Sequence, residues 1–242
     1  MAALTPTPLP PSAPTVSVVV PDAIWVSERP VWFSGVRLRA RTTVLRLADG
    51  GLLVHSPPEP TEEFCAALRA LGELRWIVVP NCFHHLGARA TAARFPSAQV
   101  VGPPSATARN PQLQLDMGLR DDAFLGAVKE LDAIPLDGVP FLDETVFFHR
   151  PTGSLIGADV VISACARDHW TWRWAARLTG CYDKVRTPPD VRKKTKPNDA
   201  AARSIDRMAA LPLKRLLVAH ADAIEDRPSE QLVDAWRFVR AG

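Results

Sequence analysis

An apolar, β-branched run from Trp76 to Val79 stops and gives way to a group of polar side chains, Asn81, Cys82, His84 and His85. The run has the length and composition of a buried strand. Two adjacent histidines at the end of a strand cannot both point into one core, so at least one of them faces a cleft or solvent. A strand that ends in potential metal ligands is typical of metallohydrolase sites. This stretch therefore constrains both the fold and the chemistry of the chain.

The segments around this strand alternate between strand and helix patterns. Thr61 is a candidate N-cap for a helix that ends at Gly72, and a second helix is expected from Leu86 to Phe95. A strand at Ala98–Gly102 completes a strand–helix–strand–helix–strand order, which favours an α/β fold.

The region before Thr61 is rich in β-prone residues. We expect short pieces separated by Pro or Gly to form a meandering antiparallel sheet, with a hairpin turn at Asp49-Gly50-Gly51. The pieces are Val16–Val20, Ile24–Val26, Val31–Phe33, Arg37–Ala40, Thr42–Leu47 and Leu52–His55.

The second half repeats the order of a sheet followed by helices. Strands are expected at Glu130–Pro135, Thr145–His149, Ser154–Ile162 and Arg215–Ala219, and a helix at Asp199–Met208. A final amphipathic helix is expected at Ser229–Arg240, with Ser229 as its N-cap.

Composition limits the partners and the compartment. With 29 basic and 26 acidic residues the net charge is only +3, too small an excess to indicate nucleic acid as a partner. The 4 cysteines show no disulfide-framework spacing, which favours a cytoplasmic location. No run approaches the roughly 20 apolar residues of a membrane helix, so we expect no stable membrane insertion. Residues 1–15 predict a disordered, proline-rich tail and residues 16–242 a single domain.

Polar residues with coordinating side chains end several of the expected strands. Besides the His84-His85 pair, they include His55, Asp159 and His220, with Asp222 close behind. Ligand sites of open α/β folds gather beyond strand ends, so these residues can converge. Imidazole and carboxylate together suit zinc, iron or manganese. Asp159 interrupts an apolar strand, where its carboxylate needs a metal, an arginine or backbone donors as a partner.

Three tryptophans alternate at positions 170, 172 and 174, which on an extended segment places all three on one face. With Arg173 beside them, Trp170 and Trp172 are candidates for a lid that stacks on a small-molecule substrate and meets an anion. A surface patch, a homodimer contact and an interfacial membrane contact remain open as alternatives.

The stretch Pro80-Asn81-Cys82-Phe83-His84-His85-Leu86 resembles a Pro-Asn-x-x-His-His-Leu signature. The signature belongs to an uncharacterised, domain-of-unknown-function branch of the metallo-β-lactamase superfamily. The resemblance extends from Pro21 to the C-terminus, and further marks are His55-Ser56-Pro57, Phe148-His149-Arg150-Pro151 and Ala219-His220. It implies a four-layer αββα sandwich with metal ligands at the strand ends.

The superfamily's motif is His-x-His-x-Asp-His followed by an apolar residue and Gly. Anchored on His85-Leu86-Gly87, the resemblance places Pro80 and Cys82 at the first two histidine positions and His84 at the aspartate. Because proline has no ligating side chain, the first metal site is largely lost. Asp159 matches the bridging carboxylate and His220 the closing histidine.

The resemblance thus implies a single metal ion, zinc first, on His84, His85, Asp159 and His220, with Cys82 as an added thiolate. Asp159 or Asp222 is then the candidate base of a hydrolase that activates water. Two alternatives stay open. One is a redox metalloprotein with iron or manganese, and the other is a pseudoenzyme whose site has decayed and which acts in binding without a metal.

Overall fold

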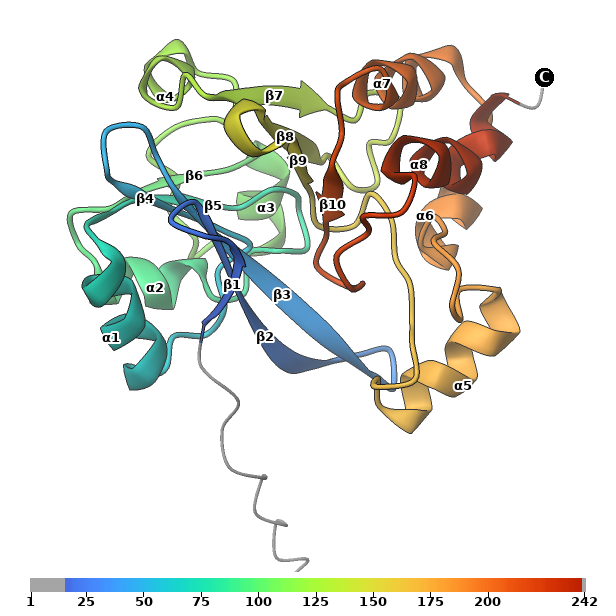
Figure 1. Ribbon diagram of the computed structural model, residues 1–242, viewed down its shortest axis with the longest axis horizontal. Coiled ribbons are helices and arrows are strands. Elements are labelled where there is room, and N and C mark those ends of the chain that lie inside the picture. The colour runs from blue at the N-terminus through green and yellow to red at the C-terminus, as the bar shows by residue number, and fades with distance from the viewer. Residues whose placement is uncertain (1–15, 241–242) are drawn as a thin grey trace, which may run out of the picture.

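The computed structural model describes residues 16–240, so the expected tail at residues 1–15 lies outside the described residues. Two β-sheets pack face to face (Figure 1). The first sheet has the order β1-β2-β3-β4-β5-β6, and its strands are β1 Ser17–Val20, β2 Ile24–Phe33, β3 Val36–Arg46, β4 Leu52–His55, β5 Leu74–Val78 and β6 Gln99–Val101. The second has the order β10-β9-β8-β7, and its strands are β7 Leu131–Pro135, β8 Thr145–His149, β9 Ser154–Ile156 and β10 Arg215–Leu217.

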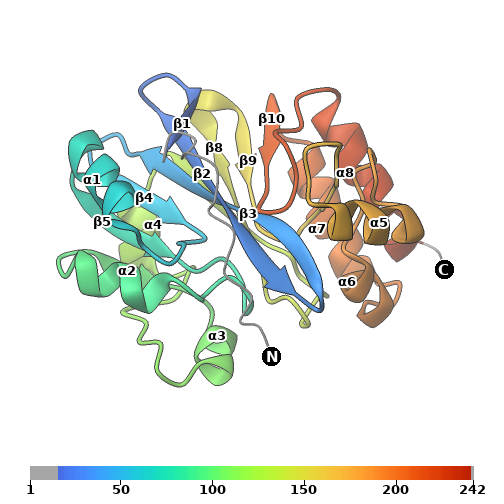
Figure 2. The ribbon, with the colours of Figure 1, turned by 90° about the horizontal axis from the view of Figure 1, so that it is seen from below.

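Helices cover the outer faces of both sheets. Figure 2 shows α1 and α2 outside the first sheet and α7 and α8 outside the second. The helices are α1 Glu62–Leu71, α2 Ala88–Arg94, α3 Pro104–Arg109, α4 Asp122–Ala127, α5 Trp170–Thr179, α6 Pro189–Lys194, α7 Asp199–Ala209 and α8 Pro228–Trp236. Short 3₁₀ turns, η1 Arg150–Thr152 and η2 Arg237–Arg240, complete the elements. The predicted four-layer αββα sandwich is therefore confirmed.

Alternation along the strands separates three apolar layers. In β5, Trp76 and Val78 pack between the sheets, against residues such as Phe147 and Leu217. Ile77, between them in the sequence, packs on the other face with the residues of α1. A third cluster joins the second sheet to α7 and α8. Because successive side chains of a strand point to opposite faces, one apolar run serves two layers.

The first hairpin is longer than the sequence predicted. Strands β2 and β3 pair without interruption from Ile24 to Phe33, and Pro30 lies opposite Arg39. Strand β1 pairs with β2 only as far as Val26, so Pro30 sits on a free edge. Its missing N–H costs no ladder hydrogen bond there, which is why the proline does not end the strand.

Two other expected elements were wrong in their boundaries. The strand from Ser154 ends at Ile156 instead of Ile162, and Asp159 lies in the loop that follows. The last long helix begins at Pro228, which has the fixed φ of a first helical residue. Arg227 is the N-cap residue, so the predicted Ser229 cap is wrong.

The tryptophan segment is helical, and the extended arrangement predicted for it is wrong. The side chain of His169 accepts a hydrogen bond from the Thr171 N–H, and Gly180 ends the helix in the left-handed conformation. These two caps stabilise α5, which separates Trp172 on its buried side from Trp170 and Trp174 on its exposed side. No helix within residues 16–240 is both long and apolar enough to span a membrane.

The fold explains Gly87, which follows the two histidines. A Cβ at this position would lie 2.0 Å from the backbone carbon and oxygen of Pro58. We therefore expect Gly87→Ala to lower the free energy of unfolding by about 3 kcal/mol or more, because backbone cannot move aside as a flexible side chain can. Urea denaturation of the purified variant measures this change.

Gly126→Ala in α4 is the matched control, because a Cβ at Gly126 has nothing within 4 Å. A helical Gly-to-Ala change at an open position stabilises by about 0.5–1 kcal/mol. Equal effects of the two substitutions would contradict the close approach of Gly87 to Pro58.

Candidate metal centre

Three side chains from distant parts of the chain meet at one edge of the sandwich. His84 follows β5, Asp159 follows β9 and His220 follows β10, so each lies beyond the carboxyl end of a strand. The His84 Nε2 lies 3.1 Å from Asp159 Oδ2, and the His220 Nε2 lies 3.6 Å from Asp159 Oδ1. The two imidazole rings are tilted, with centroids 5.2 Å apart.

The remaining nitrogen of each imidazole is fixed by a second contact. His220 Nδ1 donates a hydrogen bond to the backbone carbonyl of Arg39, at 2.6 Å. His84 Nδ1 contacts the Ser56 hydroxyl at 2.5 Å. Because Nδ1 of His220 carries the proton, its Nε2 lone pair faces Asp159. This is the orientation that outer partners give to metal-binding histidines.

Asn81 joins the turn that carries His84 to the loop that carries Asp159. Its amide nitrogen donates to Asp159 Oδ2 at 2.9 Å and to Glu144 Oε2 at 3.0 Å. Its amide oxygen accepts the N–H groups of Phe83 and His84, both at 2.9 Å. Asn81 is fully buried, so this single side chain holds two of the three residues in register.

Glu144 takes the place of a strand partner for the Asp159 loop. Its carboxylate accepts hydrogen bonds from the backbone N–H of Ala158 at 2.7 Å and of Asp159 at 2.9 Å. Burial and then the neighbouring Asp159 charge raise the pKa of Glu144 to about 7. The buried carboxyl thus satisfies backbone donors that have no ladder to join.

Charges within the group of three compensate one another. Burial alone would raise the pKa of Asp159, but His84, His220 and Asn81 hold that pKa below its ordinary value. Burial likewise opposes a charge on His84, yet Asp159 raises the His84 pKa. Burial lowers the pKa of His220, which favours its neutral form. Asp159 and His84 therefore favour opposite charges on each other.

The donor set fits one divalent cation. The three candidate ligand atoms all lie within 4.8 Å of one another. Zinc bonds of about 2.0–2.2 Å to imidazole nitrogen and carboxylate oxygen place ligand atoms about 3.3 Å apart in tetrahedral geometry. The Nε2 atoms of His84 and His220 lie 3.1 and 3.6 Å from the two different oxygens of Asp159, which is close to that spacing. A cation held there would compete with a proton on His84, because an imidazole nitrogen must be deprotonated to bind a metal.

The three residues open into a cavity of about 640 Å³. One face of the β2–β3 hairpin forms a wall of this cavity, with Val31 and Phe33 from β2 and Val36 and Leu38 from β3. Trp172 of α5 also lines it. A mainly apolar hollow with a few polar groups at one end has the character of a small-molecule site.

Two further sequence-predicted ligands line the cavity but stand outside the group of three. His85 Nδ1 faces the Asn110 amide at 3.4 Å. The Cys82 thiol donates to the Phe141 carbonyl at 3.4 Å, and burial raises the thiol pKa, which disfavours the thiolate form. Within residues 16–240, only His84, Asp159 and His220 form a group with metal-ligand spacing.

Asp222, predicted as a candidate base, lies in a cluster of charged residues that do not line the cavity. This cluster comprises Glu28, Arg39, Arg41, Arg167, Asp168 and Asp222. Asp222 pairs with Arg39 at 2.8 Å and with Arg167, and it is not among the residues that line the cavity. The cluster holds the strand whose Arg39 carbonyl orients His220.

Helix α5 places the candidate substrate-binding residues in different surroundings. Trp172 is buried and lines the cavity, whereas Trp170 is 65% exposed. Arg173 does not line the cavity, and its guanidinium donates to the Ala166 carbonyl at 3.2 Å.

Sequence reasoning missed the roles of Arg39, Ser56 and Glu144. Ser56 stood within a quoted motif, and Glu144 precedes an apolar strand, where a buried carboxylate calls for a partner. Arg39 acts through its backbone carbonyl, so its side chain gave no signal.

Comparison with solved structures shows a shared fold. A metallo-β-lactamase from Pontibacter korlensis superposes with a TM-score of 0.63 over 94% of this chain and 99% of its own, at 14% sequence identity. The enzyme FIM-1 from Pseudomonas aeruginosa, in its mono-zinc form, gives a TM-score of 0.62 over 96% and 99%, at 9% identity. The fold is that of the metallo-β-lactamases.

A metallo-β-lactamase from Erythrobacter litoralis, with β-mercaptoethanol in its active site, gives a TM-score of 0.63 over 92% of this chain and 95% of its own, at 13% identity. Residues 21–115 match the family described as Domain of unknown function (DUF4336). This range includes His84 and His85 but not Asp159 or His220. No curated protein matches the chain by sequence.

The charge cluster predicts a pH dependence of stability. Burial alone would raise the pKa of Glu28, but hydrogen bonds from Arg167 and Arg41 lower it to about 2, below the value of 4.5 for a free glutamate. A carboxylate with a lowered folded-state pKa stabilises the fold above its unfolded pKa, and this contribution is lost as the pH falls through the folded pKa. Relative to Glu28→Gln, the wild type should therefore lose unfolding free energy between about pH 4.5 and pH 2.

Urea denaturation at a series of pH values measures this difference. Glu225→Gln is the control, because Glu225 is exposed and makes only an outer ion pair with Arg215. Parallel stability curves for the wild type and Glu28→Gln would show that Glu28 does not carry the effect.

Proposed function

We propose that this protein is a metal-dependent hydrolase that acts on a small molecule. It holds one cation on His84, Asp159 and His220, and zinc is the ion that we propose before iron or manganese. The observation that carries the proposal is that two imidazole nitrogens and one carboxylate oxygen lie within 4.8 Å of one another in the lining of the apolar cavity. The mono-zinc form of FIM-1 adds support, because it is a structure of this fold with one zinc.

A cation with three protein ligands and an open position lowers the pKa of bound water to about 7 and polarises a carbonyl or phosphoryl oxygen. The residues of this chain supply the rest. His220 is oriented by Arg39, and Asp159 is oriented by Asn81 and by the loop that Glu144 holds. The apolar wall of the cavity excludes water and receives the non-reacting part of a substrate.

Asp159 is the candidate for proton transfer as well as for ligation. It is the carboxylate that both faces the cavity and contacts the two imidazoles. One oxygen is shared by His84 and Asn81, and the other faces His220, so the two oxygens have different partners. Asp222 is engaged by two arginines, and we assign it a structural part in this mechanism.

A redox function is the second candidate, because the same ligand set also suits a redox-active metal. Two histidines and one carboxylate with open positions are also the set that holds non-haem Fe(II). The identity of the bound metal separates the two proposals.

All four cysteines are free, which supports the proposed location in a reducing compartment such as the cytoplasm.

Metal binding is the first test. We expect the purified wild type to bind about one equivalent of zinc and to gain thermal stability when zinc is added, because a ligand that binds only the folded state stabilises it. His84→Ala and His220→Ala should each lose both effects. Elemental analysis and thermal unfolding measure them without an assay for activity.

His85→Ala is the matched control, since it removes the adjacent imidazole that lies outside the group of three. It should retain zinc. Loss of zinc in His85→Ala but not in His84→Ala would contradict the proposed ligand set, and about one equivalent of iron would favour the redox function.

Hydrolysis is the second test. The zinc-loaded wild type should cleave at least one member of a panel of ester, thioester, amide and phosphoester compounds. A chelator should abolish the cleavage and zinc should restore it. Asp159→Asn should lose about 10²-fold or more in rate, because it removes both a ligand charge and the proton acceptor. Hydrolysis that survives full removal of the metal would contradict the proposal.

A further inference from the structure

Large apolar side chains are exposed mainly on one surface of the molecule. Of the seven that are well exposed among the described residues, two stand apart, Val18 and Leu86. The other five belong to α5 and to the tip of the β2–β3 hairpin, and we call them the aromatic surface: Trp32, Phe33, Trp170, Trp174 and Leu178. Side chains of this size that gather in one place mark a binding surface.

The helix presents these residues as a stripe. Trp170, Trp174 and Leu178 follow one another at intervals of four residues, and they are 65%, 63% and 69% exposed. The opposite side of α5 is buried, because Trp172 and Ala176 pack against Leu38 and its neighbours. The packing of α5 against the rest of the protein therefore does not use Trp170, Trp174 or Leu178.

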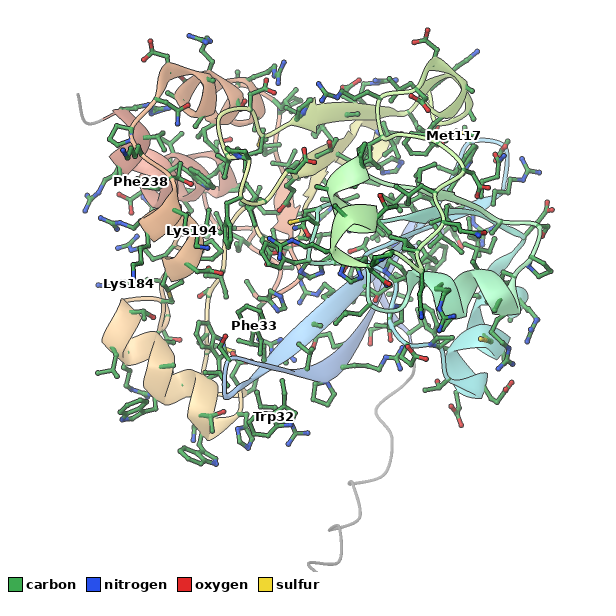
Figure 3. All side chains as sticks on the ribbon, turned by 180° about the vertical axis from the view of Figure 1, so that it is seen from behind. Trp32, Phe33, Met117, Lys184, Lys194 and Phe238 are labelled. Carbon is green, nitrogen blue, oxygen red and sulfur yellow. The ribbon has the colours of Figure 1, made fainter. Side chains whose placement is uncertain are left out.

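The hairpin tip continues the stripe. The rings of Trp32 and His169 lie 6.0 Å apart, and the rings of His169 and Trp170 lie 5.8 Å apart. The Arg37 N–H donates to the Thr171 hydroxyl at 3.0 Å, which ties the hairpin to the first turn of α5. Figure 3 shows Trp32 and Phe33 at the end of the hairpin beside this helix. Trp32 thus joins the hairpin tip to the exposed side of α5, whereas Phe33, on the opposite face of the strand, lies at the cavity.

The charges around the aromatic surface are basic. Arg37 lies in the hairpin, and Arg173 and Arg177 lie in α5, whereas residues 29–48 and 169–182 contain no Asp or Glu. None of these three arginines has an ion-pair partner within residues 16–240. Arg177 is exposed and lies over the ring of Tyr182 at 3.6 Å. Asp183 and Lys184 follow in the sequence, and their opposite charges add no net charge.

We propose that the aromatic surface docks the protein onto an anionic lipid bilayer, without spanning it. Tryptophan with arginine on one face of a helix is typical of elements that lie in the headgroup region. Anionic headgroups supply the negative charge that the surface itself lacks. A two-fold contact with a second copy would instead bring the same arginines face to face with no carboxylate between them.

The docked orientation places the cavity near the lipid. Phe33 belongs to the aromatic surface and also lines the cavity, and Trp172 lines the cavity from the inner side of α5. The docking itself does not depend on the proposed hydrolase.

Co-sedimentation of the full chain with vesicles tests the proposal. We expect binding to phosphatidylcholine vesicles that contain about 30% phosphatidylserine, weaker binding to pure phosphatidylcholine, and a decrease with added salt. The double substitution Trp170→Ala/Trp174→Ala should lower binding to the anionic vesicles by about tenfold or more, because both rings leave the headgroup region. Arg177→Gln should lower it by about fivefold.

Val18→Ala and Arg227→Gln are the matched controls, since both residues are exposed away from the aromatic surface, and they should bind like the wild type. Circular dichroism confirms that each variant is folded. Two results would overturn the proposal. One is the absence of vesicle binding by the wild type. The other is a dimer in sedimentation velocity that Trp170→Ala/Trp174→Ala abolishes, which would assign the surface to a second copy of the chain.

Discussion

The carboxylate of Asp159 is 14% exposed, and a charge so far withdrawn from water is stable only with compensating partners. The imidazole of His84 and the amide of Asn81 supply them. The hydrogen bonds that Glu144 accepts from the Ala158 and Asp159 N–H groups fix the backbone of the loop that carries the carboxylate. Removing one partner leaves the charge buried and underpaired. The geometry of the whole site therefore follows from the need to hold this one group.

The two sheets contribute unequal parts to that task. The first sheet brings His84 and Asn81 from the end of β5, and it brings the Arg39 carbonyl from β3. The second brings Asp159 after β9 and His220 after β10, which lie side by side because these strands are parallel neighbours. The hydrogen bond from His220 to Arg39 crosses between the sheets, and the charge cluster around Arg39 supports it. The position of the site is thus a property of the packed sandwich.

The alternation of apolar strands and amphipathic helices predicted an α/β fold because this signal is local and strong, and the resemblance to the metallo-β-lactamase superfamily implied the four-layer sandwich. The sequence also identified His84, Asp159 and His220 as strand-end residues, and the structure brings these three together. It could not separate His84 from His85. That separation depends on the turn in which Asn81 accepts the N–H groups of Phe83 and His84, so that adjacent histidines face different surroundings.

Other features needed tertiary information. The alternation of Trp170, Trp172 and Trp174 is compatible with a strand or a helix, and the caps at His169 and Gly180 decide between them. Pro30 is acceptable inside a strand only because β1 ends its pairing before that residue. Arg39 contributes to the site through its backbone carbonyl, a group that every residue possesses. For Pro30 and Arg39 a long-range contact, rather than residue type, determines the outcome.

The cation that we propose binds between His84, Asp159 and His220. Anomalous diffraction at the zinc edge, from crystals grown with zinc, tests this binding most directly. We expect one peak at about 2 Å from the Nε2 atoms of both histidines and from a carboxylate oxygen of Asp159. A peak bound to His85 or Cys82 with these three residues unligated, or no peak in this cavity, would contradict it.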